Sequence, residues 1–121
     1  MKKYNRNVHI SDEQEKYYDT FVVVKRTEKF YPEGDGARAD VINRELVYTS
    51  FSTALDEYMK QCERAWQDIR YADSHKQSQI IAHTISLQGY NNTGLVNTEE
   101  EGNDYIPDTF RTAVYRYSPD E

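Results

Sequence analysis

The feature that most constrains this fold is a helical repeat of apolar residues in the middle of the chain. Between Phe51 and Ile69 the apolar side chains recur at steps of three and four residues, and charged side chains fill the positions between them. This spacing predicts an amphipathic helix of about five turns over residues 51–70, with an N-cap at Ser52 or Thr53. Early acidic residues and the late Arg70 suit the helix dipole, and residues 72–75 are expected to end the helix.

Four shorter segments have the pattern of strands. Residues 21–24 are a β-branched run that is too short for a helix, and we expect them in a central strand. Part of residues 41–49 is expected to pair with it as a hairpin with a long tip. In residues 79–88 one face carries Ile81, His83, Ile85 and Leu87, and Gly89 is expected to end that strand. The last strand is expected over residues 109–117, before Pro119.

The order strand, strand, helix, strand, strand predicts an α+β fold. We expect an antiparallel sheet of about four strands with one long amphipathic helix packed on one face. Residues 1–121 are interpreted as a single domain, with a frayed N-terminus (residues 1–10), a capping box (residues 11–14) and a long loop (residues 89–108). The other face of such a sheet is left uncovered, and it is expected to be polar or to form a dimer surface.

Composition excludes several classes of protein. One cysteine in 121 residues excludes a disulfide framework and a multi-cysteine zinc site. A net charge of −6 argues against direct nucleic-acid binding through phosphate neutralisation. No apolar stretch approaches the roughly 20 residues of a membrane span. We therefore expect a cytoplasmic protein, in the host cell, with no membrane partner.

The side chains that most often carry catalysis are scattered. His9, His75 and His83 lie in a tail, at a helix end and in a strand, at no metal-binding spacing. His83 is expected to be a buried histidine bonded to a neighbour, and Cys62 a core residue. Neither a nucleophile motif nor a phosphate-binding loop is present. The sequence therefore predicts no catalytic residue, no metal site, no cofactor and no enzymatic activity.

The long loop carries the candidate ligand site. If the strands on either side of it are neighbours, both ends of the loop meet at one end of the sheet. Asparagine amides bind sugar and base edges, arginine binds phosphate in two contacts, and tyrosine offers a stacking surface. By alternation Arg111 shares a face with Tyr115 and Tyr117, while Arg116 takes the other face. The candidate ligand-binding residues are Tyr90, Asn91, Asn92, Arg111 and Arg116. A plain loop without a ligand is the alternative interpretation.

Three segments of the second half resemble a known group of proteins. They are the helix at residues 51–70, the strand at residues 80–87 with the Gly-Tyr-Asn-Asn that follows at residue 89, and the Ile-Pro-Asp-Thr-Phe-Arg at residues 106–111. Together they resemble the phage-encoded Thoeris anti-defence proteins. The resemblance implies a homo-oligomer, a dimer or higher, that sequesters a cyclic ADP-ribose signal without cleaving it, in pockets near the subunit interface. It assigns no individual binding residue.

Two functions remain open at this point. The first is a small phage-type anti-defence protein that binds and sequesters a cyclic nucleotide immune signal. The second is an acidic protein–protein inhibitor that blocks a basic nucleic-acid-binding surface of a host defence protein. The second hypothesis depends on the acidic residues of the loop, Glu99, Glu100, Glu101 and Asp104.

Overall fold

The expected α+β fold is confirmed by a computed structural model, which describes residues 16–31, 38–91 and 108–119. The N-terminal segment, the capping box and the hairpin tip lie outside these residues, and the first two described residues, Lys16 and Tyr17, are helical. The elements are β1 (Thr20–Tyr31), β2 (Arg38–Tyr48), α2 (Phe51–Ser74), β3 (Ile80–Tyr90) and β4 (Asp108–Tyr117).

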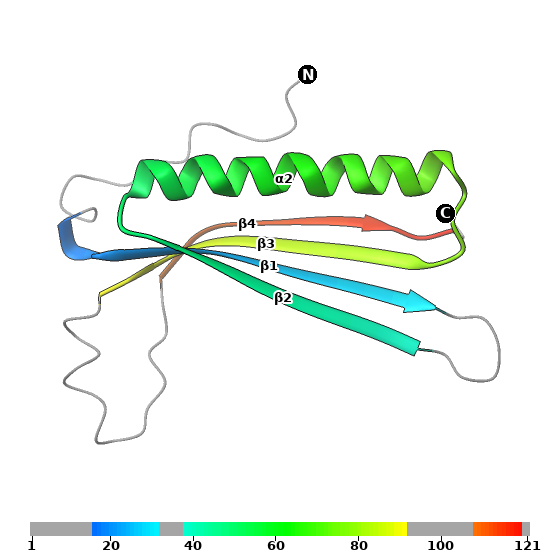
Figure 1. The fold of residues 1–121 in the computed structure, drawn as a ribbon, viewed down its shortest axis with the longest axis horizontal. Coiled ribbons are helices and arrows are strands. Elements are labelled where there is room, and N and C mark those ends of the chain that lie inside the picture. The colour runs from blue at the N-terminus through cyan, green and yellow to red at the C-terminus, as the bar shows by residue number, and fades with distance from the viewer. Residues whose placement is uncertain (1–15, 32–37, 92–107, 120–121) are drawn as a thin grey trace.

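The four strands form one sheet in the order β2-β1-β3-β4, and every neighbouring pair is antiparallel. The predicted central position of β1 is confirmed, and its start at Phe21, Val22 and Val23 is buried on both faces. β2 and β3 run in the same direction on either side of β1. Strands related in this way need a long crossover connection, and α2 supplies it along one face of the sheet (Figure 1).

Helix α2 ends at Ser74, within the predicted range of residues 72–75, but its N-cap differs from the predicted ones. Its N-cap is Ser50, whose Oγ accepts a hydrogen bond from the backbone N–H of Thr53, so the predicted caps at Ser52 and Thr53 are wrong. The first turn contains no acidic residue and the last turn no basic residue, because the helix continues to Ser74, beyond Arg70. The predicted favourable dipole pattern is therefore absent, and tertiary packing stabilises this helix instead.

The core lies between α2 and the sheet. On the helix side the small residues Ala54, Cys62 and Ala65 are fully buried beside the larger Tyr58, and they let the helix approach the strands closely. The sheet supplies larger side chains, among them Ile85 and Leu87 of β3. Burying each of these aliphatic side chains contributes about 1.5–3 kcal/mol. The buried face of the helix and the alternating face of β3 are those that the sequence predicts.

The loop end of the sheet holds an aromatic cluster, consisting of Tyr18, Phe21, Phe51 and Phe110. A β-bulge in β4 makes this cluster possible: Leu87 pairs with Arg111 and Gln88 pairs with Thr109, so Phe110 is the extra residue. The bulge changes the alternation of β4, and both Phe110 and Tyr115 therefore pack against the same core.

The sequence predicts that Gly89 ends β3, and this prediction is wrong. Gly89 lies inside the strand, which continues to Tyr90. A Cβ at this position would lie 2.8 Å from Cε2 and 2.9 Å from Cζ of Phe110. The ring of Phe110 crosses β3 at the place that a side chain of residue 89 would occupy. This close approach therefore requires a glycine at position 89.

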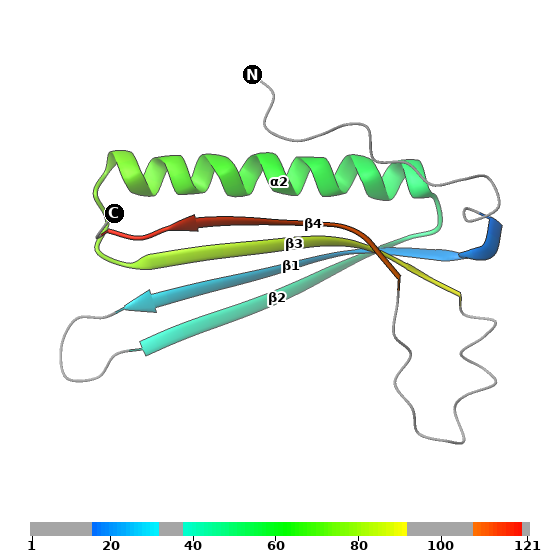
Figure 2. The ribbon, with the colours of Figure 1, turned by 180° about the vertical axis from the view of Figure 1, so that it is seen from behind.

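The second face of the sheet is open. α2 lies along one face, and no long helix or second sheet among the described residues covers the other face (Figures 1 and 2). The sheet twists beneath the helix, so that β2 lies farthest from it in both views. We call this second surface the open face, and it carries the even-numbered residues of β1 and β3.

Candidate functional site

The two ends of the long loop meet, as expected from neighbouring strands. Gly89 pairs with Asp108, and the backbone carbonyl of Tyr90 accepts a hydrogen bond of 3.1 Å from the N–H of Asp19. The Tyr90 hydroxyl donates to Oε1 of Gln88 at 3.3 Å. Asn91 is the last residue described on this side of the loop, and Asn92, like the acidic residues at positions 99–101 and 104, lies outside the described part.

The two candidate arginines lie on opposite faces, as the alternation predicts. Arg111 pairs with Leu87 and lies under α2, close to the hydroxyl of Tyr58. Burial raises the pKa of Tyr58, and the guanidinium of Arg111 acts against this rise. Arg116 pairs with Ala82 on the open face. Ala82 is eight residues from Tyr90 along β3, about 26 Å at the usual rise of a strand.

The predicted site is therefore not assembled as one cluster by the described residues. Tyr90 and Asn91 lie at the loop end, Arg111 lies beneath the helix, and Arg116 lies toward the other end of the sheet. The sequence pattern identified the correct faces for the arginines. It gave no information on how far apart the residues lie along the strands, because that depends on the register.

His83 on β3 forms a polar contact with both β1 and α2. The residue is 4% exposed, its Nδ1 lies 3.0 Å from Oγ1 of Thr27, and its Nε2 lies 2.7 Å from Oδ2 of Asp68. A carboxylate only accepts, so Nε2 carries the hydrogen, and Nδ1 of the neutral ring accepts from the threonine hydroxyl. Burial lowers the pKa of His83, which favours this neutral form. The expected buried, bonded histidine is confirmed.

Cys62 is a core residue, as expected. It is fully buried on α2 between Tyr58 and Tyr115, and burial raises the pKa of its thiol. A thiol with a raised pKa is a poor nucleophile at neutral pH. Both Cys62 and the Thr27–His83–Asp68 contact are best explained by packing.

The open face contains a groove near the ends of the strands that lie opposite the loop. It has a volume of about 290 Å³, and residues of all four strands line it. Its hollow shape follows from two alanines: Ala82 separates Glu28 from Arg116 across the sheet, and Ala39 lies beside Phe30. The lining residues are Glu28, Lys29, Phe30, Ala39, Val41, Ile80, Ala82 and Arg116. We call this site the open-face groove.

The open-face groove combines an apolar floor with charges of both signs. Glu28 is held by Arg26, whose Nη2 and Nε donate to its Oε2 at 3.1 and 3.3 Å. Arg116 lies two strands away in the same row, about 10 Å across the sheet at normal strand spacing. The ring of Phe30 is 38% exposed beside them. A carboxylate, a guanidinium and an aromatic ring thus face one hollow.

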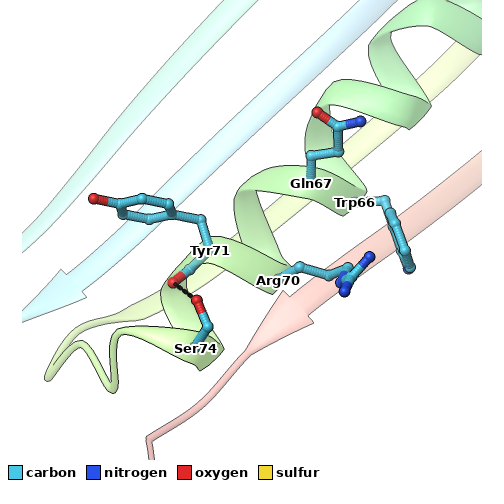
Figure 3. Close-up of a pocket in the computed structure, with 5 residues that line it drawn as sticks. All are labelled: Trp66, Gln67, Arg70, Tyr71 and Ser74. Atoms are coloured by element: carbon cyan, nitrogen blue, oxygen red, sulfur yellow. Dashed lines mark hydrogen bonds between the residues drawn. The ribbon is translucent and has the colours of Figure 1, made fainter.

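A second hollow lies on the outer surface of α2 (Figure 3). It has a volume of about 280 Å³ and is lined by Trp66, Gln67, Arg70, Tyr71 and Ser74. The guanidinium carbon of Arg70 lies 4.7 Å from the Trp66 ring centroid, so this aromatic surface is already occupied by a cation. Tyr71 stacks on His75 at 3.9 Å. Because one helix supplies all its walls, this hollow encloses a ligand less well than the groove.

Sequence reasoning identified Arg116 but missed the other residues of the open-face groove. Their alternation along β1 was visible, because Glu28 and Phe30 share a face in any strand. Their neighbours on β2 and β3 depend on the pairing Glu28 with Val41 and Ala82, which the sequence does not specify. The open-face groove could therefore not be predicted without the register in which β1 pairs with β2 and β3.

Three further observations concern membrane-spanning helices, metal sites and similarity to known proteins. No helix in the described segments is long and apolar enough to cross a membrane. The described residues contain no group of three or more histidine, cysteine or acidic side chains that could hold a metal ion. Comparisons of the chain with protein-family models, with curated proteins and with solved structures found no match.

Proposed function

We propose that this protein is a non-enzymatic binding protein that sequesters a small cyclic nucleotide, such as an isomer of cyclic ADP-ribose, in the open-face groove. The observation that carries this proposal is the presence of Arg116, Glu28 and Phe30 around one apolar hollow. Sequestration of this kind would suit a phage protein that removes an immune signal.

Three side chains of the groove have a definite role in this proposal. The guanidinium of Arg116 binds phosphate oxygens through paired N–H donors. The ring of Phe30 offers a face for the base, and the carboxylate of Glu28 accepts hydrogen bonds from base N–H groups or ribose hydroxyls. A volume of about 290 Å³ lies near the lower end of the range for small-molecule sites, so the groove holds part of such a ligand.

The experiment that tests this function is ligand recovery. The purified protein is incubated with cyclic ADP-ribose isomers and cyclic dinucleotides, freed of unbound ligand and heated, and the released molecules are identified by mass spectrometry. Recovery of an intact cyclic nucleotide supports sequestration. Recovery of an altered nucleotide indicates catalysis, and recovery of nothing contradicts the proposal.

Two variants locate the site. Arg116→Ala is expected to weaken binding about ten- to a hundredfold, because a hydrogen-bonded charged contact contributes about 1.5–3 kcal/mol. Ala82→Leu is expected to abolish binding by filling the groove without changing any charge. Arg64→Ala is the matched control, since Arg64 is an exposed arginine of α2 on the opposite side of the sheet. Equal binding by all three variants and the wild type would place the ligand elsewhere.

A further inference from the structure

Strand β2 is a long and regular edge of the sheet. It spans 11 residues, and no strand of the described chain pairs with its outer side. Its pairing with β1 runs without a bulge, and it contains neither proline nor lysine, two residue types that protect sheet edges. The other edge strand, β4, is interrupted by the bulge at Phe110. β2 is therefore the better template for a further strand.

Apolar side chains lie on both faces of this edge. Val41 is 45% exposed on the open face, and Ile42 is 57% exposed on the opposite face, where β2 diverges from the helix. Adjacent β-branched residues of this exposure at the middle of an edge strand favour association with another strand.

We propose that β2 pairs with β2 of a second copy of this chain, antiparallel and about a two-fold axis at Ile42, to form a continuous eight-stranded sheet. In this register Ile42 meets Ile42 of the second copy. Asp40 meets Arg44 of the second copy, and the symmetry repeats this contact on the other side of the axis. The edge is thus complementary to itself in both charge and hydrophobicity.

The neighbouring registers are less favourable. An axis at Arg44 would place two arginines opposite one another, and an axis at Val41 would place Arg38 opposite Arg44. An axis at Asn43 would place Ile42 against Arg44 and Val41 against Glu45. Of these four registers, the axis at Ile42 is the one that places opposite charges directly across the two strands, Asp40 against Arg44. Such pairs stabilise strand pairing, so this axis is selected.

The charges within one copy support this register. Arg44 is the cross-strand neighbour of Lys25 on β1, so two cations lie side by side at this edge. Burial lowers the pKa of Lys25, and Arg44 and Arg64 add to this effect while Asp68 opposes it. A carboxylate from Asp40 of the second copy would lie next to Arg44 and offset the repulsion between the two cations.

The pairing would also extend the open-face groove, a consequence that rests on the proposed function. Ala39 and Val41 line the groove from β2. In the proposed register Glu45 and Asn43 of the second copy lie beside them on the same face. Each groove would then gain a polar wall that a single copy lacks.

A charge-swap series measured by sedimentation or light scattering tests the pairing. The wild type is expected at twice the 14.3 kDa of one chain. Asp40→Lys and Arg44→Glu, each alone, place like charges opposite one another and are expected to give the mass of one chain. The double variant Asp40→Lys/Arg44→Glu restores opposite charges and is expected to restore the doubled mass. Both substitutions fall on exposed positions, and circular dichroism verifies that the three variants fold.

Val114→Lys on β4 is the matched control, because Val114 is 64% exposed at the other edge. It is expected to keep the doubled mass. A wild type with the mass of one chain at all concentrations, single variants that stay paired, or a double variant that stays unpaired would each overturn the proposal. Ligand recovery is measured separately, so loss of ligand binding with an intact doubled mass would reject the function and leave the pairing in place.

Discussion

At the scale of single residues, Gly89 is the position where a small change has the clearest structural cost. Gly89→Ala is expected to lower the free energy of unfolding by about 1–3 kcal/mol, because its Cβ would lie within 3 Å of the Phe110 ring. Urea unfolding monitored by circular dichroism measures this difference. A variant as stable as the wild type would show that the ring moves aside at little cost.

The Phe110→Leu background provides the control for this prediction. Leucine lacks the ring atoms that approach position 89, so Gly89→Ala is expected to cost less in this background than in the wild type. A double-mutant cycle isolates the coupling between the two positions. Equal costs in both backgrounds would assign the effect of the alanine to another contact.

At the scale of secondary-structure elements, His83 connects α2 to the sheet through hydrogen bonds. It lies on β3 and contacts Thr27 on β1 and Asp68 on α2, so one ring joins three elements. Burial lowers its pKa in the folded protein, and Lys25 and Lys29 act in the same direction, against the opposing effect of Asp68. The neutral ring is therefore part of the folded packing.

The lowered pKa of His83 determines the direction in which the stability of the fold changes with pH. The unfolded chain binds a proton on His83 near pH 6.5, whereas the folded protein binds it only at lower pH. Stability is therefore expected to fall as the pH drops below about 6.5. His83→Asn is expected to be less stable at pH 7 but to lose less stability than the wild type between pH 7 and pH 5. The exposed His75→Gln is the control, and an unchanged slope in His83→Asn would contradict this role.

The type and order of the elements could be predicted from the sequence because they depend on periodicity. The run at residues 21–24, the alternation in β3 and the helical repeat after Phe51 are local patterns, and all three predictions are confirmed. The cap at Ser50 was missed because three candidate residues, Ser50, Ser52 and Thr53, lie within one turn. Gly89 was misinterpreted because its role depends on the ring of Phe110, which lies on another strand.

The candidate site was less predictable than the fold for the same reason. Faces follow from alternation within a strand, and the opposite faces of Arg111 and Arg116 are as predicted. Neighbours across strands follow from register, which the bulge at Phe110 alters within β4 itself. The open-face groove is formed by such cross-strand neighbours, so only Arg116 among its residues appeared as a candidate.

At the scale of the whole molecule, the helix covers one side of the sheet and leaves β2 the least protected strand (Figure 1). Pairing of two copies through β2 would protect this strand, and it makes stability depend on protein concentration. The thermal midpoint of the wild type is expected to rise with concentration, because association stabilises only the folded chain.

Asp40→Lys is expected to have a midpoint that does not change with concentration, while Val114→Lys is expected to behave like the wild type. Hydrogen exchange shows which strand the second copy protects. Backbone amides of β2 are expected to exchange faster in Asp40→Lys than in the wild type at the same concentration. Faster exchange along β4 in place of β2 would assign the contact between copies to the other edge. Such a result would leave the fold as described and would move the second copy away from the open-face groove, because Ala39 and Val41 line it from β2.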